Sequence, residues 1–389
     1  MTIRNHSKIK WGRCRMTSIK LAPGATIGII GGGQLGKMMA QSALRMGYKV
    51  AVLDPSEDAP ASATSHTFIN AEFGDLEALK SLCEMSDVVT YEFENIDAQI
   101  LHTLVDDYHV PQGAKTVLTL QNRETEKEAI SASGARIVPY EKVASEDDVR
   151  IFMETHGSPV IVKTATGGYD GKGQYLLERD ADIDAAGIPF GETAFVAEKY
   201  IALEREVSLT IARSVGGQVI HFPLQENLHK DQVLYRTIVP SRVDYTEEAQ
   251  KEAAKIMDAL HFVGAFTIEF FIDRDDTLYV NEIAPRPHNS GHYSIEACNI
   301  SQFDAHILSI LDHPMPEVHL YQNAVMMNLL GEDLDRLDNE LFTHPEWHVH
   351  IYGKSVRKPA RKMGHVTVLT GNLDNTLDAL SRDFTKETK

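Results

Sequence analysis

The chain has 389 residues, 43% of them hydrophobic and 24% charged, which is enough for two or three domains of ordinary globular composition. Its formal net charge of −18 argues against a general binder of nucleic acids or anionic membranes, but not against a local basic pocket for a small anion. The three cysteines are far apart, so a reducing compartment and a cytoplasmic location are expected. No apolar run reaches the roughly 20 residues that a membrane span requires.

Residues 1–23 differ from the rest of the chain. They carry several basic residues, including Lys8 and Arg13, but no apolar segment follows them as a signal peptide would require. We therefore expect a disordered extension ahead of the first domain, arising from a start codon upstream of Met16.

A β-α-β unit with a glycine turn opens the first predicted domain, residues 24–122. A buried strand leads into Gly31–Gly36, and a helix then runs to about Leu44. The alternation of strands and helices that follows predicts a Rossmann-like, doubly wound parallel sheet. The strands are expected at residues 25–30, 48–53, 67–70 and 87–91.

Two interpretations of the glycine turn remain open. The pattern GxGxxG at a helix N-terminus can hold a nicotinamide dinucleotide, with Asp54 on the ribose, as in a dehydrogenase. The same backbone N–H groups can instead bind a phosphorylated substrate. The second interpretation is more economical, because a better nucleotide site lies further along the chain.

A charged helical stretch near residues 121–134 begins the second predicted domain, residues 123–312, and a small C-terminal domain is expected at residues 313–389. The fold class predicted for the whole chain is α/β, with an α+β arrangement in the central domain. Gly216-Gly217 is expected to be a hairpin turn. Strands are expected at residues 159–163, 174–177, 195–200, 207–212, 218–224, 325–329, 349–352 and 366–369, and helices at residues 247–261 and 303–311.

The loop from Lys163 to Gln174 has the composition of a phosphate-binding lid. Its glycines allow backbone N–H groups to close on phosphate oxygens, and Lys163 and Lys172 add positive charge. It is not a Walker A loop, because Lys172 is followed by glycine and then by a strand. The alternative is a long hairpin tip with solvated lysines.

Residues 197–206 are candidates for the adenine and ribose of a nucleotide. A linker after a strand can offer backbone N–H and C=O groups to an adenine edge, and a carboxylate just beyond it can accept bonds from ribose hydroxyls. The same charges, including Glu204 and Glu206, fit a solvated edge strand equally well.

A predicted hairpin carries two facing carboxylates. If Asp275 and Asp276 are the two central turn residues, antiparallel pairing places Glu269 opposite Glu282, at about 5 Å between Cβ atoms. Their apolar neighbours make unpaired carboxylates costly, so the pair needs a cation. Mg2+ fits best, and Mg2+ held by carboxylates usually holds nucleotide phosphates as well. The alternative is an exposed hairpin whose carboxylates pair with lysines.

Two further polar segments are candidates for substrate binding. The segment from Arg286 to His292 directly follows the hairpin, and the fork of Arg286 could orient a small planar anion beside a metal-bound triphosphate. The segment from Lys354 to His365 is basic in an acidic chain and is either a wall for a substrate phosphate or a solvated surface.

These motifs together resemble the ATP-grasp superfamily of ligases, and within it the family of N5-carboxyaminoimidazole ribonucleotide synthetases. The resemblance covers nearly the whole chain from about Gly24 and implies an ATP-grasp fold with a Rossmann-like N-terminal domain and a small C-terminal domain. It rests on these segments: GIIGGGQLG at 28–36, YEFEN at 91–95, GGYDGKGQ at 167–174, NEIAPRPHNSGH at 281–292 and KMGH at 362–365.

The resemblance implies a role for each matching residue. ATP would be held by Arg123, Lys163, Gly168, Tyr169, Asp170, Gly171, Lys172, Gly173, Gln174, Glu198, Lys199, Tyr200, Ile201, Glu206, His229, Asn281 and Glu282. Glu269 and Glu282 would hold Mg2+, and Arg286, His288, Asn289 and Lys172 would serve catalysis, the first three of them on bicarbonate or carboxyphosphate. The ribonucleotide would be bound by Gln34, Glu92, Lys354, Arg361 and Lys362, and the family further suggests a homodimer.

The implied reaction agrees with the chemistry of these residue types. Bicarbonate is a poor electrophile, because its leaving group would be hydroxide, and phosphorylation by ATP replaces that group with phosphate. The carboxyphosphate so formed decomposes in water, which a mobile glycine lid would exclude. The amine of 5-aminoimidazole ribonucleotide then attacks carboxyphosphate or the CO2 that it releases.

Three alternatives to this reaction stay open at this point. The first is another ATP-grasp ligase, such as a formate-dependent glycinamide ribonucleotide transformylase or a biotin carboxylase. The second is the nicotinamide-dependent dehydrogenase that the glycine turn suggests. The third is a non-catalytic nucleotide sensor, against which the retention of Lys163, Glu269, Glu282 and Arg286 argues.

Overall fold

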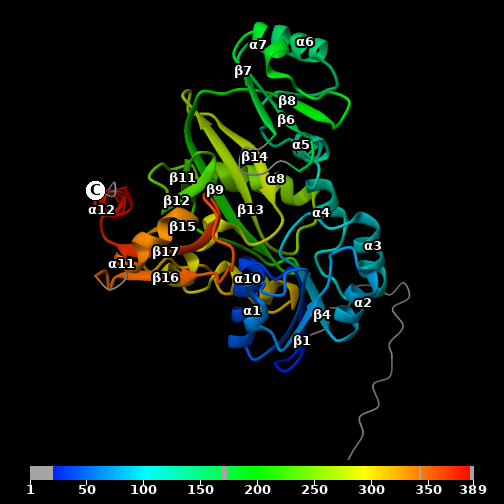
Figure 1. Ribbon diagram of the computed structural model, residues 1–389, viewed down its shortest axis with the longest axis vertical. Helices are drawn as coiled ribbons and strands as arrows, with labels where there is room; N and C mark the ends of the chain where they lie inside the picture. The colour runs from blue at the N-terminus through cyan, green and yellow to red at the C-terminus, as the bar shows by residue number, and fades with distance from the viewer. Residues whose placement is uncertain (1–20, 168–172, 341–342, 386–389) are drawn as a thin grey trace, which may run out of the picture.

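The computed structural model describes residues 21–167, 173–340 and 343–385 (Figure 1). Most of the predicted N-terminal extension and five residues of the predicted lid, Gly168, Tyr169, Asp170, Gly171 and Lys172, lie outside the described residues. The predictions made for those residues therefore stay predictions.

The N-terminal region folds around a four-stranded parallel sheet of order β3-β2-β1-β4. Hydrophobic residues such as Ile29 and Val52 are fully buried because helices cover both faces of the sheet. The predicted doubly wound parallel arrangement is confirmed. The elements are β1 (Thr26–Ile30), α1 (Gln34–Arg45), β2 (Lys49–Asp54), β3 (Thr67–Asn70), α2 (Leu76–Glu84), β4 (Val88–Tyr91), α3 (Ala98–Asp107) and α4 (Lys115–Leu120).

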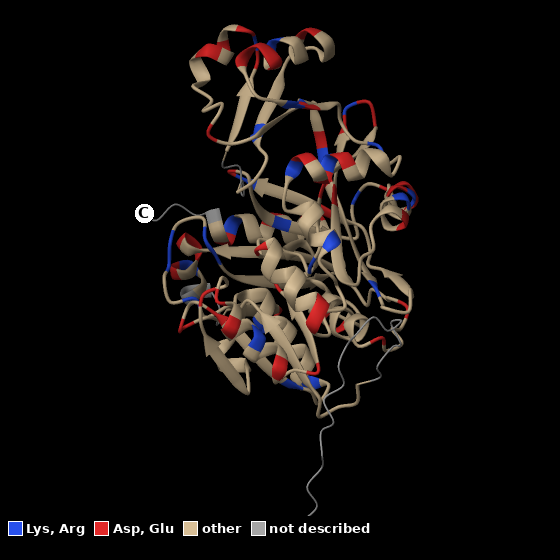
Figure 2. Cartoon of the chain, turned by 90° about the vertical axis from the view of Figure 1, so that its right-hand side faces the viewer, with Lys and Arg blue, Asp and Glu red and all other residues tan. Residues whose placement is uncertain are grey.

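A second, antiparallel sheet of order β5-β8-β6-β7 forms a lobe at the top of the molecule in Figure 1. It follows helix α5 (Arg123–Ala132), and part of the acidic surplus of the chain lies on its two covering helices (Figure 2). The lobe consists of β5 (Tyr140–Val143), α6 (Glu146–His156), β6 (Val160–Thr164), β7 (Gln174–Leu177), α7 (Ala181–Ala186) and β8 (Phe195–Lys199).

The largest sheet has nine strands in the order β14-β13-β9-β11-β12-β15-β17-β16, with β10 paired to β9. The hairpin turn predicted at Gly216-Gly217 joins β9 to β10. The strands of the last predicted domain continue this sheet through the β12–β15 pairing, so the chain limits of the three domains remain predictions. The strands are β9 (Leu203–Arg213), β10 (Val219–His221), β11 (Gln225–Lys230), β12 (Val233–Val239), β13 (Gly264–Asp273), β14 (Leu278–Ala284), β15 (Asn323–Leu330), β16 (Trp347–Ile351) and β17 (Lys362–Thr370).

The β13–β14 hairpin brings Glu269 opposite Glu282, as predicted, but by a different route. The turn is not the expected two-residue turn, because Asp276 N donates to the carbonyl of Asp273, Asp276 has φ +58°, and Ile272 pairs with Leu278. A register shift beyond Phe270 then moves the pairing by one residue. The bulge restores the glutamate pair that the assumed turn would have given directly.

The remaining helices pack on these sheets. Helix α8 (Thr246–Ala259) buries Ala253, Ile256 and Met257, which lie on one face of the helix, in the cluster that contains residues of β13 and β14. Helix α10 (Gln302–Ile310) lies between the N-terminal sheet and β13. Short helices α9 (Ser294–Ala297) and α11 (Leu334–Glu340) and the C-terminal helix α12 (Leu373–Thr385) complete the described elements, apart from three 3-10 turns. No helix within the described ranges is long and apolar enough to cross a membrane.

Candidate active site

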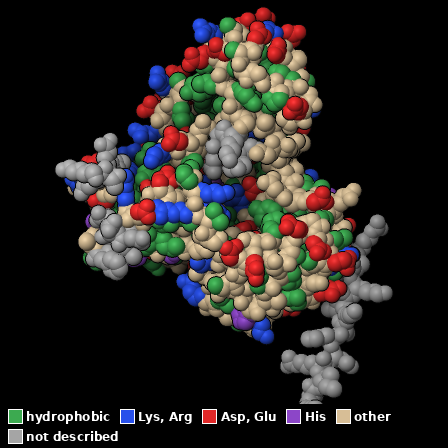
Figure 3. Space-filling view, viewed as in Figure 1, with side chains coloured by type: hydrophobic (Ala, Val, Ile, Leu, Met, Phe, Trp, Pro, Cys, Tyr) green, Lys and Arg blue, Asp and Glu red, His purple; other side chains and the backbone are tan. Residues whose placement is uncertain are grey.

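Positive charge is concentrated where the upper lobe meets α5. Lys163, at the end of β6, donates to Oε2 of Glu198 at 2.9 Å, and Lys127 of α5 lies 3.2 Å from the same oxygen. All three side chains are buried. Figure 3 shows Lys and Arg side chains gathered on this face of the molecule, between the lobe and the rest of the chain.

The charges of this cluster do not cancel. Burial alone would raise the pKa of Glu198, but Lys127, Lys163 and Arg123 outweigh it and lower this pKa to about 2. Burial lowers the pKa of Lys163, and the nearby Arg123 and Lys127 lower it further. Glu198 acts in the opposite direction but does not outweigh them. Three cations thus surround one carboxylate, whose Oε1 is buried without a hydrogen-bond partner. Such an excess of buried positive charge suits phosphate oxygens.

Negative charge is concentrated on the neighbouring hairpin. Burial, and then the facing Glu282, raise the pKa of Glu269 well above its usual range. Glu126 adds a third carboxylate, and burial together with Glu282 raises its pKa to about 7 although its Oε1 accepts the Ile283 N–H at 2.7 Å. The Nη1 of Arg123 lies 4.0 Å from Glu282 and links the hairpin to the positive cluster.

This arrangement fits a divalent cation. Two carboxylates face each other on paired strands, and the pKa of Glu269 stays raised by burial and by Glu282 although Lys362 opposes that shift. Oxygen ligands of this kind, completed by phosphates and water, are those that Mg2+ prefers. Within the described parts of the chain, no cluster of three or more His, Cys, Asp or Glu residues is arranged to hold a metal ion.

The residues predicted for adenine and ribose lie along the exit from the upper lobe. Lys199 ends β8, and Tyr200 and Ile201 connect it to β9. Nδ1 of His229 on β11 lies 2.8 Å from Oε2 of Glu206 on β9, so these two predicted residues are neighbours. The structure therefore brings together two residues that were predicted to contact ATP and are 23 positions apart in the sequence. Asn281 lies beside Glu282 on β14, at the bulge.

The loop after the hairpin places Arg286 against the N-terminal region. Its Nε and Nη2 donate to the two oxygens of Glu94 at 2.5 and 3.1 Å, a bidentate pair. Burial would raise the pKa of Glu94, but the guanidinium lowers it. The guanidinium therefore lies where a small anion could reach it, but its Nε and Nη2 groups are already bonded to Glu94.

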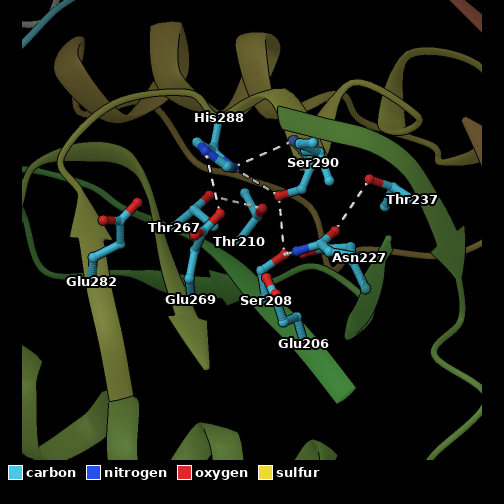
Figure 4. Close-up of polar contacts among 12 residues, drawn as sticks. Glu206, Ser208, Thr210, Asn227, Thr237, Thr267, Glu269, Glu282, His288 and Ser290 are labelled. Atoms are coloured by element: carbon cyan, nitrogen blue, oxygen red, sulfur yellow. Dashed lines mark hydrogen bonds and ion pairs between the residues drawn. The ribbon is translucent and has the colours of Figure 1, made fainter. Parts of the chain in front are cut away.

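His288 and Asn289 follow in the same loop. Nε2 of His288 lies 3.5 Å from Oε1 of Glu269, and its Nδ1 is 2.9 Å from the hydroxyl of Ser290 (Figure 4). That hydroxyl reaches Ser208, which lies next to Glu269 in the pairing of β9 with β13. Asn289 is buried, and both polar atoms of its amide are without a hydrogen-bond partner. Such a group is costly unless a ligand satisfies it.

The glycine turn is already occupied by the protein. Glu92 accepts from the N–H groups of Gly33 and Gly36 at 2.6 and 2.5 Å, and Asp54 accepts from Gly32 at 2.7 Å. A Cβ on Gly36 would lie 2.3 Å from the Gly31 carbonyl, so this glycine allows a close packing of helix on turn. The carboxylates of Asp54 and Glu92 therefore bind the N–H groups that were expected to bind the pyrophosphate of a dinucleotide or a substrate phosphate.

The residues predicted for the ribonucleotide come together only in part. Burial and Arg361 lower the pKa of Lys354 to about 8 against the opposing effect of Glu92, which shows that these groups are neighbours. Lys362, whose carbonyl accepts from Lys354 at 2.8 Å, also lowers the pKa of His288. The guanidinium of Arg361 is turned to the Val356 carbonyl on the surface, at 2.5 Å. Gln34 is the first residue of α1, next to the glycines that Glu92 binds.

Three charged residues, of which Lys127 and Glu126 are buried and Glu94 is half-buried, were missed by the sequence analysis. Lys127 lies four residues after Arg123 on a helix that begins at Arg123, so helical spacing alone would have put both on one face. Glu126 adjoins it, but nothing in the sequence indicates that it would reach the backbone of β14. Glu94 lies inside the segment YEFEN, where the sequence analysis selected only Glu92 as a site residue.

A buried cationic cluster beneath a small antiparallel lobe, linked to a carboxylate hairpin, is the arrangement expected of an ATP-grasp protein, and the ATP-grasp domain family matches residues 128–303. Residues 24–121 match the ribonucleotide synthetase preATP-grasp domain, and residues 324–379 match the phosphoribosylaminoimidazole carboxylase C-terminal domain. More particularly, the chain belongs to the family of N5-carboxyaminoimidazole ribonucleotide synthases. It is 56% identical over 359 residues to the synthase of Staphylococcus aureus strain MRSA252, covering 92% of this chain and 96% of the relative.

Solved structures agree with this assignment. The S. aureus N5-carboxyaminoimidazole synthetase in complex with ADP has a TM-score of 0.92 and 55% identity, covering 94% of this chain and 98% of that one. The Aspergillus clavatus synthase with ADP and 5-aminoimidazole ribonucleotide has a TM-score of 0.86 and 29% identity, covering 93% and 98%. The predicted family and ATP-grasp fold are confirmed, and the dehydrogenase hypothesis is not supported.

Proposed function

We propose that this ligase carboxylates 5-aminoimidazole ribonucleotide with bicarbonate and ATP, giving the N5-carbamate, ADP and phosphate, in purine biosynthesis. One observation carries the proposal. The hairpin carboxylates are linked on one side to the buried positive cluster, through Arg123 at Glu282, and on the other to the loop that carries the orphaned Asn289 amide, through His288 at Glu269. Family membership supplies the identity of the acceptor.

ATP would be bound by the positive cluster. Arg123 and Lys163 would contact its phosphates, and Lys127 would continue to neutralise Glu198 when Lys163 turns to a phosphate oxygen. The backbone from Lys199 to Ile201 would line the adenine, and the Glu206–His229 pair would face the ribose. The lid residues Gly168–Lys172, with Gly173 and Gln174, would cover the phosphates, and Lys172 would add a charge near the transferring group.

Glu269 and Glu282 would hold Mg2+, with Asn281 beside them. The ion, when bound, would neutralise phosphate charge in the phosphoryl transfer. The neighbouring His288 contacts Glu269 through Nε2, so it would orient that carboxylate from the side of the bicarbonate site. Burial and the charges of Arg286 and Lys362 lower the pKa of His288 well below its usual range, so its ring is neutral.

Bicarbonate would lie between Arg286, His288 and Asn289. The guanidinium supplies positive charge, while the Asn289 amide offers one donor and one acceptor that the protein leaves unused. Glu94 fixes the plane of the guanidinium through two bonds. Because carboxyphosphate decomposes in water, the burial of this loop is itself part of the function.

The ribonucleotide would approach from the N-terminal sheet and β17. Gln34 begins α1, the Glu92 carboxylate accepts from N–H groups at that helix start, and Glu92 is near enough to Lys354 to affect its pKa. Lys362 also acts on the pKa values of Glu269 and His288, so this side adjoins the carboxylating site. Arg361 would have to turn inward from Val356 to reach the substrate.

ADP release measured with three acceptors tests the proposal. We expect bicarbonate and 5-aminoimidazole ribonucleotide together to stimulate ATP hydrolysis, and glycinamide ribonucleotide or biotin to leave it unchanged. Stimulation by either of the other acceptors, or none by aminoimidazole ribonucleotide, would overturn the proposal. Titration with NADH and with ATP–Mg2+ tests the dehydrogenase alternative, which requires tight binding of the dinucleotide.

We also propose a homodimer in the cytoplasm and three domains at 24–122, 123–312 and 313–389, preceded by the extension. Family membership supports the dimer, and the low cysteine content supports the compartment. Sedimentation at several protein concentrations would reveal the dimer.

A further inference from the structure

Gln302 is a fully buried side chain that contacts the loop of Arg286–His292 at several points. It is the first residue of α10, and its Oε1 accepts from the backbone N–H of His288 at 2.9 Å. This bond determines which end of the amide is oxygen, because an N–H can only donate. The Nε2 group then donates to the His288 carbonyl at 2.7 Å and to Nδ1 of His292 at 3.0 Å.

The loop is folded around this amide. A Cβ on Gly291 would lie only 2.4 Å from Oε1 of Gln302, so a side chain there would push the loop away. Ser294 donates from its hydroxyl to the Gly291 carbonyl at 2.6 Å and accepts from the Gln302 N–H at 2.9 Å. His288, Gly291 and His292 are thus all held against one side chain.

Helix α10 connects this amide to both halves of the site. His306 of the helix lies 2.8 Å from the Thr90 hydroxyl on β4 and accepts from the Ala265 N–H on β13 at 3.1 Å. Asp304 forms a further contact with Ser42 of α1. The helix is therefore fixed both to the sheet that carries Glu92 and to the strand that carries Glu269.

We propose that Gln302 is a positioning residue for the anion: its amide holds the His288 and Asn289 backbone, and through it their side chains, at the place where bicarbonate is phosphorylated. The inference rests on the proposed function. Asn289 has no side-chain partner of its own, so its orientation depends on the backbone of the loop. A displacement of about 1 Å at a reacting centre can cost on the order of a hundredfold in rate.

The variant Gln302→Met tests the proposal, with Ser301→Ala as its matched control. Ser301 caps α10 one residue earlier and contacts Asp304, not the loop. We expect Gln302→Met to raise the KM for bicarbonate on the order of tenfold or more and to increase the ATP consumed per carbamate formed. The KM for ATP should stay within about twofold of the wild type, because Lys163 and Arg123 lie elsewhere.

Hydrogen exchange of a peptide covering residues 288–292 gives a readout that is independent of the reaction. It should quicken in Gln302→Met and stay slow in Ser301→Ala. Unchanged exchange, or a KM for ATP that rises in parallel with that for bicarbonate, would overturn the inference. A wild type without bicarbonate-dependent turnover would instead overturn the proposed function. If Gln302→Met does not fold, Gln302→Asn, which draws the amide back by one methylene, should show the same exchange and KM changes.

Discussion

The site contains two neighbouring groups of charged side chains, one buried and one partly exposed, that are constructed in opposite ways. Around Glu198, two lysines approach one carboxylate oxygen, and the pKa of that carboxyl falls to about 2. On the hairpin, Glu269 faces Glu282, and the pKa of Glu269 rises well above its usual range. The first group stabilises its charge within the protein, whereas the second does not. The comparison suggests that folding depends on the first group and ligand binding on the second.

The largest effect is expected on activity, from Glu282→Gln. This change removes a proposed Mg2+ ligand, and we expect kcat/KM for ATP to fall about a thousandfold, or about 4 kcal/mol. The fold should persist, because the Glu282 side chain is 45% exposed and faces a like charge. Steady-state kinetics over a range of Mg2+ concentrations and a thermal melt provide the measurement. Asp275→Asn, at the turn of the same hairpin, is the control. Near-normal turnover in Glu282→Gln would contradict the proposed role of the hairpin in binding Mg2+.

The second effect is expected on stability, from Glu198→Gln. The pKa of Glu198 is about 2 in the folded protein against an ordinary value of 4.5, which corresponds to about 3 kcal/mol at neutral pH. Because the folded pKa is lowered, this stability is present above about pH 4.5 and is lost as the pH falls toward 2. Urea denaturation of both proteins at pH 7 gives the difference. Glu124→Gln breaks the more exposed pair with Lys142 and should cost less than about 1 kcal/mol; an equal cost for both variants would refute the distinction.

The third effect separates the anion loop from both groups. Arg286→Ala should leave the dissociation constant for ADP unchanged but lower bicarbonate-dependent turnover about a hundredfold, because the guanidinium that stabilises the bound anion is lost. The companion variant Glu94→Gln removes the ion pair but keeps the guanidinium. Bicarbonate kinetics that change equally in both variants would assign the effect to the ion pair alone.

The sequence was sufficient for residues whose function is set by local pattern. The glycine turn, the facing glutamates and the loop after the hairpin were all predicted, because a strand pairing or a motif brings their members close together in the chain. Even there, the predicted turn was wrong and the pairing right, since a bulge between Glu269 and Phe270 compensated for a turn that is one residue longer than expected. The register was inferred from the assumed turn, so the predicted pairing of Glu269 with Glu282 is right only because the bulge offsets the error in that turn.

The residues that the sequence analysis missed form contacts between separate segments of the chain. Glu94 meets Arg286 across 192 positions, Glu126 meets Ile283 across 157, and Gln302 closes on a loop 14 positions earlier. None of these contacts follows from periodicity or composition, because each depends on how the N-terminal sheet, α5 and α10 pack against the hairpin. Glu92 is a related case: it was selected for the substrate, but its carboxylate binds the glycine turn in this structure.

The smallest effect concerns Glu126, which belongs to the uncompensated group but is not a proposed metal ligand. Its folded pKa of about 7 lies above the ordinary 4.5, so its contribution to stability is present below about pH 4.5 and is lost as the pH rises through 7. Without Mg2+, the wild type should therefore lose about 2 kcal/mol relative to Glu126→Gln between pH 5 and pH 7. Urea denaturation at several pH values measures this slope, and Glu128→Gln, on the same helix, is the control. Since Glu282 is part of the cause, Glu282→Gln should flatten the same slope, and an unchanged slope in that variant would separate Glu126 from the hairpin.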